Sequence, residues 1–445
     1  MQSEVKAPIR YAVVAAVQLP NVSDIEFEAS LNELRELAKT LGYQIVHTFA
    51  QKRASFDTTG YLGIGKREEI RDYVSASAED EPQSLDAQLP PIEAVLVDHE
   101  ISPAQARNLE IEVGCEVMDR TMVILEIFHR NARSRAARAQ VEIARLGYMA
   151  PRLREAAKLA GPQGRQRSGA GGRGAGESHT ELDRRKIRDR IAELQQEIIV
   201  MDGERRTQRA RRQERQTMAS VALVGYTNAG KSTLMRALTG SEVLVANKLF
   251  ATLDTTVRAL YPESVPRVLV SDTVGFIKNL PHGLVASFKS TLDEALDASL
   301  LLHVIDASDP GFERQLEVTD KVLEEISADE VPRIRVFNKI DYVGDATAQA
   351  ECEAALRLKY PDCVVMSARR PHEVAIMHQK IVEFFQQHLV ESEIFLPWSA
   401  QQLRGKIYST CQVVSERSED DGTLFIVRGE ANDIDSLREQ LTQLE

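Results

Sequence analysis

The stretch that decides the fold is Val221-Ala-Leu-Val-Gly-Tyr-Thr-Asn-Ala-Gly-Lys-Ser-Thr233. An apolar run typical of a buried strand leads to Gly225, and four residues later Gly230-Lys231-Ser232 opens a helix with leucines at helical spacing. A strand, a glycine-rich turn and a helix in this order form the phosphate-binding loop of nucleotide-binding proteins. The glycines let backbone N–H groups turn toward a polyphosphate, and the helix presents its positive N-terminal end. We therefore predict a nucleotide site here.

Two side chains of this loop have predicted roles in phosphate chemistry. Lys231 is expected to reach the β- and γ-phosphates, and the Ser232 hydroxyl is expected to hold Mg²⁺. Lys231 is therefore the first candidate for a catalytic residue. The residues of the loop predicted to contact the nucleotide are Gly225, Tyr226, Thr227, Asn228, Ala229, Gly230, Lys231, Ser232 and Thr233.

Three further motifs follow, and each stands at the end of an apolar run of strand type. The first is Asp272-Thr273-Val274-Gly275, in which the aspartate can hold Mg²⁺ through a water and the glycine leaves room for the γ-phosphate. The second is Asn338-Lys339-Ile340-Asp341, and the third is Ser367-Ala368-Arg369. One such motif is common by chance, but all of them in this order after a phosphate-binding loop are not.

Asp341 decides which base is bound. Its carboxylate can accept hydrogen bonds from both the N1–H and the amino group of guanine. Adenine offers no such pair and would leave the carboxylate desolvated and unpaired. We expect the Lys339 stem to pack along the base and the Ala368 N–H to reach the guanine O6. The motifs together predict that the ligand is GTP, accompanied by Mg²⁺.

The composition is that of a globular protein with two to four domains. The chain has 445 residues, of which 43% are hydrophobic and 27% are charged. No apolar run approaches the length of a bilayer span, and the N-terminus lacks a signal-peptide core. The four cysteines are scattered without a C-x-x-C pair, which argues against disulfides or structural zinc and fits a reducing cytosol. They are Cys115, Cys352, Cys363 and Cys411.

The net charge of −12 hides a strong asymmetry. Residues 130–215 contain 22 lysines and arginines against 11 aspartates and glutamates, a local charge of +11, so the remainder of the chain carries −23. A basic segment in an acidic chain points to a polyanionic partner, and its excess of arginine favours RNA because guanidinium pairs with phosphate through two parallel hydrogen bonds. A solvated helical face is the alternative.

Residues 1–129 alternate strand and helix patterns, which predicts an N-terminal α/β domain with a parallel sheet. Ser102-Pro103 is expected to begin one of its helices, with serine as the N-cap and proline at the first helical position. Gly63-Ile-Gly-Lys66 lacks a suitable preceding strand, so we interpret it as a turn and not as a phosphate loop.

Residues 130–217 are predicted to form a basic helical hairpin. Its second helix carries apolar residues spaced four-three-four-three, a coiled-coil pattern of only two heptads. The loop between the helices, residues 161–176, is rich in glycine and arginine and suits contact with RNA phosphates. A flexible linker between domains is the alternative. The spaced apolar residues are Ile187, Ile191, Leu194, Ile198 and Met201.

Residues 218–390 then form the nucleotide-binding domain, and residues 391–445 a small α+β domain. In the latter, strands are expected at 395–398, 406–414 and 423–428, and a helix at 434–444. We interpret Trp398 as a packing residue and not as a ligand contact.

These regions together resemble the HflX family of ribosome-associated GTPases over nearly the whole chain. The resemblance rests on motifs in every region, including the long run Phe250-Ala251-Thr252-Leu253-Asp254 after the phosphate loop. The other matching stretches are Asp119-Arg-Thr121, Ile124-Leu-Glu-Ile-Phe128, Gln140-Val-Glu-Ile-Ala144, Tyr148-Met-Ala-Pro-Arg-Leu153, Gly171-Gly172, Arg173-Gly174-Ala-Gly176-Glu177, Glu181-Leu-Asp-Arg-Arg185, Gly225-Tyr-Thr-Asn-Ala-Gly-Lys-Ser232 and Asp272-Thr-Val-Gly-Phe276.

The resemblance implies a multi-domain α/β architecture with a Ras-like GTPase domain. It also implies binding to the large ribosomal subunit and its rRNA, dissociation of idle or stalled ribosomes, often under stress, and residues 250–254 as nucleotide contacts. Thr252 matches the switch threonine that completes the Mg²⁺ shell, which makes it a catalytic candidate beside Lys231. Ser232, Thr252 and Asp272 form the expected metal site. The chain departs from the family at Thr255, where a proline is usual, and in its glycine loop.

Asn228 is a further catalytic candidate by resemblance. It matches the asparagine with which related potassium-stimulated GTPases bind a monovalent cation, so K⁺ is a possible cofactor. That Asn228 only braces the loop through its amide is the alternative. Phe276 stands where Ras-type GTPases place the glutamine that orients water, so we expect slow hydrolysis by the free protein.

The leading hypothesis is a GTP-switched factor that splits ribosomes. There are two other hypotheses. One is an RNA chaperone or helicase-like protein in which the basic hairpin acts on RNA and GTP only tunes it. The other is a GTPase that assembles the large subunit. We expect a monomer that is cytoplasmic and partly ribosome- or membrane-associated, without a membrane span.

Overall fold

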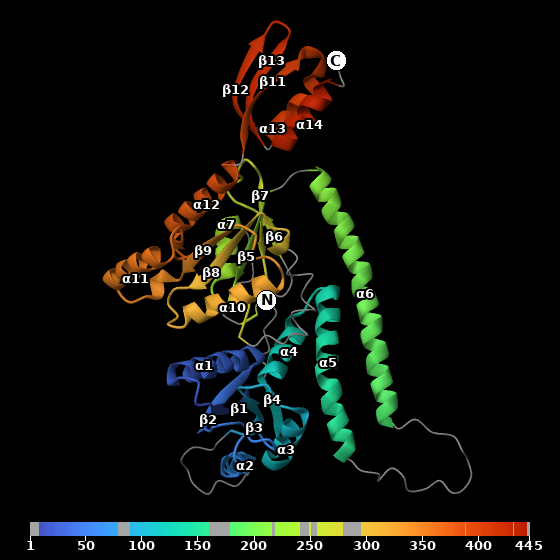
Figure 1. Cartoon of the computed structure of the whole chain (residues 1–445), viewed down its shortest axis with the longest axis vertical. Helices are drawn as coiled ribbons and strands as arrows, with labels where there is room; N and C mark the ends of the chain where they lie inside the picture. The colour runs from blue at the N-terminus through green and yellow to red at the C-terminus, as the bar shows by residue number, and fades with distance from the viewer. Residues whose placement is uncertain are drawn as a thin grey trace, which may run out of the picture. The chain divides into compact units, whose positions relative to one another are not determined.

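The computed structural model describes residues 9–78, 90–159, 179–215, 219–240, 249–250, 256–278, 295–387, 389–429 and 431–442. The chain divides into two compact units. Figure 1 labels the helices and strands of both units. The first comprises residues 1–201, 246–253 and 279–288, and the second comprises 202–245, 254–278 and 289–445. Among the described residues, no helix is both long and apolar enough to cross a membrane.

The first unit begins with a four-stranded sheet, and all of its neighbouring strands are parallel. The strand order is β2-β1-β3-β4, so β2 pairs on one side of β1 and the later strands β3 and β4 are added on its other side. The parallel sheet predicted for this region is therefore confirmed. Its elements are β1 (Arg10–Gln18), α1 (Asp24–Leu41), β2 (Tyr43–Lys52), α2 (Ile64–Ala78), β3 (Ile92–Val97), α3 (Pro103–Val113), β4 (Glu116–Asp119) and α4 (Arg120–Asn131).

Local sequence signals fix the helix ends of this sheet domain. The predicted cap at Ser102 is confirmed: its hydroxyl accepts the Gln105 N–H while the Gln105 side chain accepts the Ser102 N–H, a reciprocal capping box. Helix α1 starts at Ser23 in the same way and ends at Gly42, which adopts φ +89°. That left-handed conformation suits glycine, because a side chain would be strained there.

A buried carboxylate ties this sheet domain to the helix that follows. Asp119 is fully buried at the end of β4 and accepts hydrogen bonds from the Met122 and Ile101 N–H groups. The same carboxylate accepts the Tyr148 hydroxyl and forms an ion pair of 2.8 Å with Arg152, both on helix α5 (Arg135–Leu159). Because these partners satisfy a charge that water cannot reach, they fix α5 against the domain.

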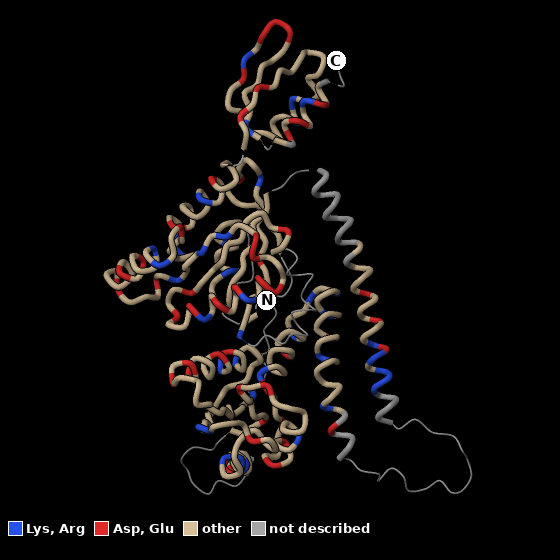
Figure 2. The backbone as a smooth tube through the Cα atoms, viewed as in Figure 1, with Lys and Arg blue, Asp and Glu red and all other residues tan. Residues whose placement is uncertain are grey.

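Helix α5 packs antiparallel against helix α6 (His179–Arg215), as the four-three spacing predicts. Ion pairs join Arg135 to Glu197 and Glu142 to Arg190, so residue numbers rise along one helix as they fall along the other. Figure 2 shows basic and acidic positions along both helices. Leu194 of the predicted seam is buried, and the other seam residues are half-buried. The glycine- and arginine-rich loop lies outside the described residues.

The second unit contains a six-stranded sheet in the order β10-β9-β8-β5-β7-β6, parallel except for the edge strand β6. Alternate residues of β5 serve opposite faces: Val221 and Leu223 pack toward α7 and α12, whereas Ala222 and Val224 pack toward α10. The elements are β5 (Ala219–Gly225), α7 (Lys231–Thr239), β6 (Thr256–Ala259), β7 (Val268–Asp272), β8 (Leu300–Asp306), α10 (Phe312–Glu325), β9 (Arg333–Asn338), η2 (Ile340–Tyr342), α11 (Ala346–Lys359), β10 (Val364–Val365) and α12 (Pro371–Gln386).

The C-terminal part of this unit is a three-stranded antiparallel sheet in the order β11-β13-β12. Residues 406–410, predicted as strand, instead belong to helix α13. Ile407 and Cys411 are four residues apart and both buried, a helical spacing, and the Cys411 N–H donates to the Ile407 carbonyl. The elements are β11 (Val390–Pro397), η3 (Trp398–Leu403), α13 (Arg404–Thr410), β12 (Gln412–Glu419), β13 (Gly422–Gly429) and α14 (Ala431–Thr442).

Trp398 begins η3 and does not continue the strand, contrary to the expectation for 395–398. Its side chain is half-exposed, and its Nε1–H donates to the Asp420 carbonyl at 2.9 Å.

Candidate nucleotide-binding site

The loop from Gly225 to Lys231 joins strand β5 to helix α7 at the carboxyl edge of the sheet. Gly225 has φ +145°, and a Cβ there would lie 2.2 Å from the Val304 carbonyl oxygen. Gly230 has φ +97°, and a Cβ there would lie 2.2 Å from the Asn338 Nδ2. Both conformation and space therefore require glycine at these two positions.

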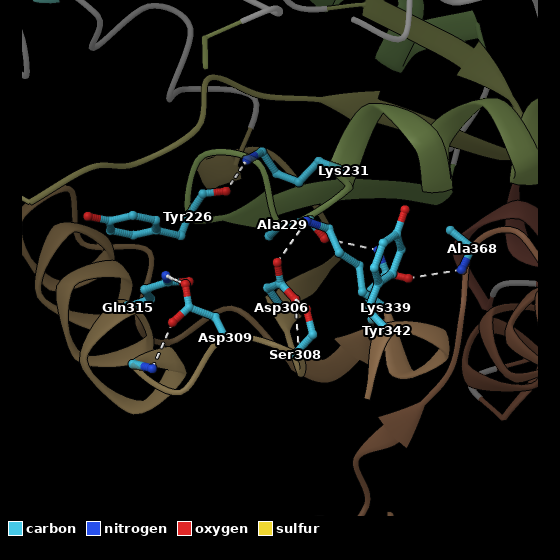
Figure 3. Close-up of polar contacts among 12 residues, drawn as sticks. Tyr226, Ala229, Lys231, Asp306, Ser308, Asp309, Gln315, Lys339, Tyr342 and Ala368 are labelled. Atoms are coloured by element: carbon cyan, nitrogen blue, oxygen red, sulfur yellow. Dashed lines mark hydrogen bonds and ion pairs between the residues drawn. The ribbon is translucent and has the colours of Figure 1, made fainter. Parts of the chain in front are cut away.

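Lys231 points back over this loop and is buried. Its Nζ donates to the carbonyl oxygen of Gly225 at 3.0 Å. It also donates to the carbonyl oxygen of Tyr226 at 2.7 Å (Figure 3). Burial lowers the pKa of this lysine to about 8, against the opposing effect of the Asp272 carboxylate. A phosphate placed at this ammonium would supply the negative charge that neutral carbonyls lack.

The predicted metal ligands Ser232 and Asp272 lie side by side. The Ser232 hydroxyl donates to the Asp272 carboxylate at 2.7 Å, and Asp272 is fully buried at the end of β7. Hydroxyl and carboxylate oxygens are the donors that Mg²⁺ prefers, and a site with few protein ligands leaves room for phosphate oxygens and water. This pair therefore fits Mg²⁺. The neighbouring Thr273 is buried and donates to the Leu223 carbonyl at 2.6 Å.

Gly275 lies against the phosphate loop. A Cβ at this position would be 2.9 Å from both the Lys231 Nζ and the Thr227 Cγ2. The backbone is held there because the Phe276 N–H donates to the Gly225 carbonyl and the Thr227 N–H donates to the Phe276 carbonyl. The Phe276 ring is buried among Ala222, Val224 and other core residues, and Val274 is also buried. Only a residue without a side chain leaves space between Gly275 and Lys231.

Asn338 links the two ends of the predicted site. Its Nδ2 donates to the Ala229 carbonyl in the phosphate loop at 2.9 Å, and its Oδ1 accepts the Ala368 N–H at 2.9 Å. The Ala368 N–H expected to reach guanine O6 therefore donates to Asn338. The Ser367 N–H donates to Glu373, and the Arg369 N–H donates to the Ser367 hydroxyl.

The Lys339 ammonium forms an ion pair with Asp306, with 2.7 Å between Nζ and Oδ2 (Figure 3). Asp306 was not among the predicted site residues, and its only signal in the sequence is its place directly after an apolar strand. Ile340 is buried at the start of η2. The Asp341 side chain is half-buried and makes no hydrogen bond or ion pair within the described ranges of the chain.

Asn228 adopts φ +61°, and its side chain is exposed. It makes no hydrogen bond to any residue that the structure describes. Thr233 is half-buried in the first turn of α7.

Phe250 belongs to the other compact unit. Its ring is buried against Phe128 of α4, with 4.5 Å between ring centroids, and its carbonyl accepts the Asn131 Nδ2–H at 3.0 Å. The preceding Leu249 N–H donates to the Thr40 hydroxyl of α1 at 3.3 Å. The Phe250 side chain thus serves packing. The other predicted contacts of this run, Ala251, Thr252, Leu253 and Asp254, lie outside the described residues.

A parallel sheet with a phosphate-binding loop, an adjoining D-x-x-G segment and an N-K-x-D turn at its carboxyl edge defines a P-loop GTPase. The chain is 50% identical to a GTPase HflX from Gluconacetobacter diazotrophicus, with 96% of each chain covered. It is 36% identical to a GTPase HflX from Escherichia coli, over 93% of this chain and 92% of that one. The chain therefore belongs to the HflX family, and it is a GTPase.

Family models match along most of the chain. They are described as GTP-binding GTPase N-terminal at residues 28–129, GTP-binding GTPase Middle Region at 131–212 and 50S ribosome-binding GTPase at 220–339. Among solved structures, the chain is similar to a GTP-binding protein from the archaeon Sulfolobus solfataricus in complex with GDP. That likeness has 23% sequence identity and a TM-score of 0.43, and it covers 84% of this chain and 99% of that one.

Proposed function

We propose that this GTPase binds the large ribosomal subunit and uses GTP to dissociate idle or stalled ribosomes. The observation that carries the proposal is the match of residues 220–339 to a family of 50S ribosome-binding GTPases. The basic segment at residues 130–215 supports it, because a local charge of +11 in an acidic chain suits rRNA phosphates. We further propose that the protein acts as a monomer in the cytoplasm.

We propose a division of labour along the chain. Residues 1–129 form an N-terminal α/β domain, 130–217 a basic hairpin, 218–390 the GTPase domain and 391–445 a small C-terminal domain. The α5–α6 packing and the buried Asp119 link support the idea that the first two regions move as one body. Ribosome contact by that body and GTP binding by the GTPase domain would then be the two coupled events.

Within the GTPase site, we propose that the chain's own residues hold and orient the phosphates. Lys231 exchanges its two backbone carbonyls for phosphate oxygens, and Gly275 leaves the γ-phosphate room beside it. Ser232 and Asp272, with Thr252 of the switch segment, would hold Mg²⁺, which offsets the charge of the phosphates when bound. Asn228 would hold K⁺ beside them. Asp341 reads the guanine edge, and Lys339, Ala368 and Arg369 surround the base.

Ribosome splitting tests the leading proposal directly. Purified ribosomes are mixed with the protein and either GTP or a non-hydrolysable analogue, and the subunits are separated on a sucrose gradient. The proposal expects free subunits with GTP and protein bound to the large subunit with the analogue. Intact ribosomes under both conditions, with binding only to immature large subunits, would favour an assembly factor instead.

The phosphate roles have their own test. Lys231→Ala and Ser232→Ala should lower GTP turnover by about two orders of magnitude or more, since each removes a contact to phosphate or Mg²⁺ and neither is a large packing residue. Circular dichroism and thermal melting report whether each variant is folded. Normal turnover in a folded variant would refute the assignment of that residue.

A further inference from the structure

The pair between Asp306 and Lys339 joins two strand ends at the guanine end of the site (Figure 3). Asp306 is the last residue of β8, and Lys339 follows the last residue of β9. The strands are in register at this point, because Asp306 pairs with Asn338 and the Ala307 N–H donates to the Asn338 carbonyl at 2.8 Å. The ion pair therefore connects two backbones that are already fixed relative to each other.

Asp306 itself is held in one orientation. Its Oδ1 accepts hydrogen bonds from the Ser308 N–H at 3.0 Å and the Ser308 hydroxyl at 2.6 Å, which leaves Oδ2 directed at the Lys339 ammonium. Its side chain is only 14% exposed. A charge-assisted hydrogen bond at this depth is stronger than one at the surface, because water screens it less.

Lys339 lies where its stem can cover a base. Its backbone adopts φ +64°, an uncommon conformation that sets the direction in which the side chain leaves the chain. Its Cε lies 3.9 Å from the place of a Cβ on Gly230, so the stem runs along the phosphate loop. A lysine free in solution samples many rotamers, and ordering it has an entropic cost.

We propose that Asp306 is a positioning residue for nucleotide binding: it holds the Lys339 stem in place before the guanine arrives. The proposal rests on the role assigned above to Lys339 as the residue that covers the base. By ordering the stem in the free protein, Asp306 removes part of the entropic cost of binding. The edge of the base is read elsewhere, so Asp306 affects affinity for the nucleotide and not the choice among purines.

Simple electrostatics predicts the opposite effect of losing this carboxylate. Asp306 is an anion beside the cation of Lys339. Lys231 is a second cation in this site, and the charge of Lys339 is one of the causes that lower its pKa. Removing the charge of Asp306 makes the site more positive, which by itself would strengthen binding of an anionic nucleotide. If positioning dominates, binding becomes weaker. The sign of the change therefore distinguishes the two effects.

Asp306→Asn is the informative variant, because the amide oxygen keeps the Ser308 hydrogen bonds while the charge is lost. We expect the Kd for GDP to rise about tenfold, which corresponds to the free energy of one charge-assisted hydrogen bond. The Kd for IDP should rise by the same factor, and the KM for GTP should rise more than kcat falls. Asp309→Asn is the matched control, since Asp309 lies three residues further on and its carboxylate accepts from the Gly311 N–H and the Gln315 side chain.

A double-mutant cycle with Lys339→Met shows whether Asp306 acts through the lysine. Methionine keeps an apolar stem and removes the ammonium. We expect Asp306→Asn to change the Kd for GDP less than about twofold in the Lys339→Met background, and Asp309→Asn to change it less than about twofold in either background. Calorimetric titration with GDP gives all these values on the full chain.

The outcomes separate the two ideas. If Lys339→Met weakens GDP binding and Asp306→Asn leaves it unchanged or strengthens it, the positioning role is overturned and the base contact stands. The positioning role is also overturned if Asp306→Asn weakens binding equally with and without the lysine. If Lys339→Met has no effect, the assignment of Lys339 itself fails, and the positioning role fails with it.

Discussion

His303 shows how strongly one buried residue can link the stability of the GTPase domain to pH. It lies in the middle of β8 with 1% of its surface exposed, and its Nδ1 is 3.8 Å from the Asp320 carboxylate. Burial is the largest cause that lowers the pKa of His303 to about 3, and the cations of Arg333, Arg335 and Lys231 lower it further. The folded protein therefore keeps a neutral imidazole at every physiological pH.

The sign of the pH effect follows from this shift. Between pH 6.5 and about 3, His303 is protonated in the unfolded chain and neutral in the folded chain. The contribution to stability is complete above pH 6.5 and is lost as the pH falls toward 3, by on the order of 5 kcal/mol in total. When the pH falls from about 7 to 4, the free energy of unfolding should therefore decrease less in the His303→Leu variant than in the native chain. Urea unfolding at several pH values measures this, and parallel curves for the two chains would contradict it.

We propose that base specificity depends on Asp341. Asp341→Asn should weaken GTP binding and favour xanthosine triphosphate, because an amide can donate to the oxygen that replaces the guanine amino group. The loss for GTP should be at least about tenfold, since a hydrogen bond to a charged group is removed. Competition between the two nucleotides for a fluorescent GDP analogue measures the preference. Unchanged GTP affinity would mean that Asp341 does not read the base.

At the scale of elements, the short segment of Leu249 and Phe250 is held by helices of the N-terminal region. The Phe250 ring is 3% exposed and packs on Phe128, and the Leu249 N–H is bonded to Thr40. Phe250→Ala removes this anchor, and a buried phenylalanine replaced by alanine typically costs about 3–5 kcal/mol. We expect faster amide hydrogen exchange at Leu249 while the β5 amides stay protected. Unchanged exchange at Leu249 would show that the anchor lies elsewhere.

The elements that the sequence predicts well are those whose signals are local. The phosphate loop, the Ser102 cap and the parallel strands all follow from short patterns of glycine, serine or apolar residues. Residues 406–410 misled the prediction, because Ile407 and Tyr408 favour strands locally, and the helix depends on burying Ile407 against the C-terminal sheet. Asp306 was missed for a similar reason: its partner Lys339 is 33 residues away, and only the register of β8 and β9 brings them together.

At the scale of the whole molecule, the asymmetry of charge leads to a prediction about ribosome binding. If the basic segment carries ribosome affinity, the logarithm of the binding constant should fall linearly with the logarithm of salt concentration, because phosphate contacts release counterions. Neutralising Arg165, Arg167 and Arg173, which lie outside the described residues, should lower affinity and reduce that slope by roughly 2 to 3. GTP hydrolysis by the free protein should not change. Binding insensitive to salt and to these substitutions would leave the segment as a solvated face.

Hydrolysis in the free protein should be slow, and the structure gives the reason. Phe276 follows Gly275 in the sequence, and its ring is buried in the core. A phenyl ring forms no hydrogen bond that could orient an attacking water as a glutamine does. Asn228 is an exposed polar side chain of the loop, and it makes no hydrogen bond within the part of the chain that the structure describes. A K⁺ bound there would offset charge between the β- and γ-phosphates, as an arginine finger does.

Two ratios of rates test this account of catalysis. GTP turnover should be faster in KCl than in NaCl at equal ionic strength, and Asn228→Ala should remove the difference while GDP still binds. Large ribosomal subunits should accelerate turnover further, because a partner that holds the switch segment against the nucleotide would complete the Mg²⁺ and K⁺ sites. Equal rates in the two salts would exclude the potassium role of Asn228. Turnover unaffected by large subunits would exclude the ribosome as the activator, whatever the cation does.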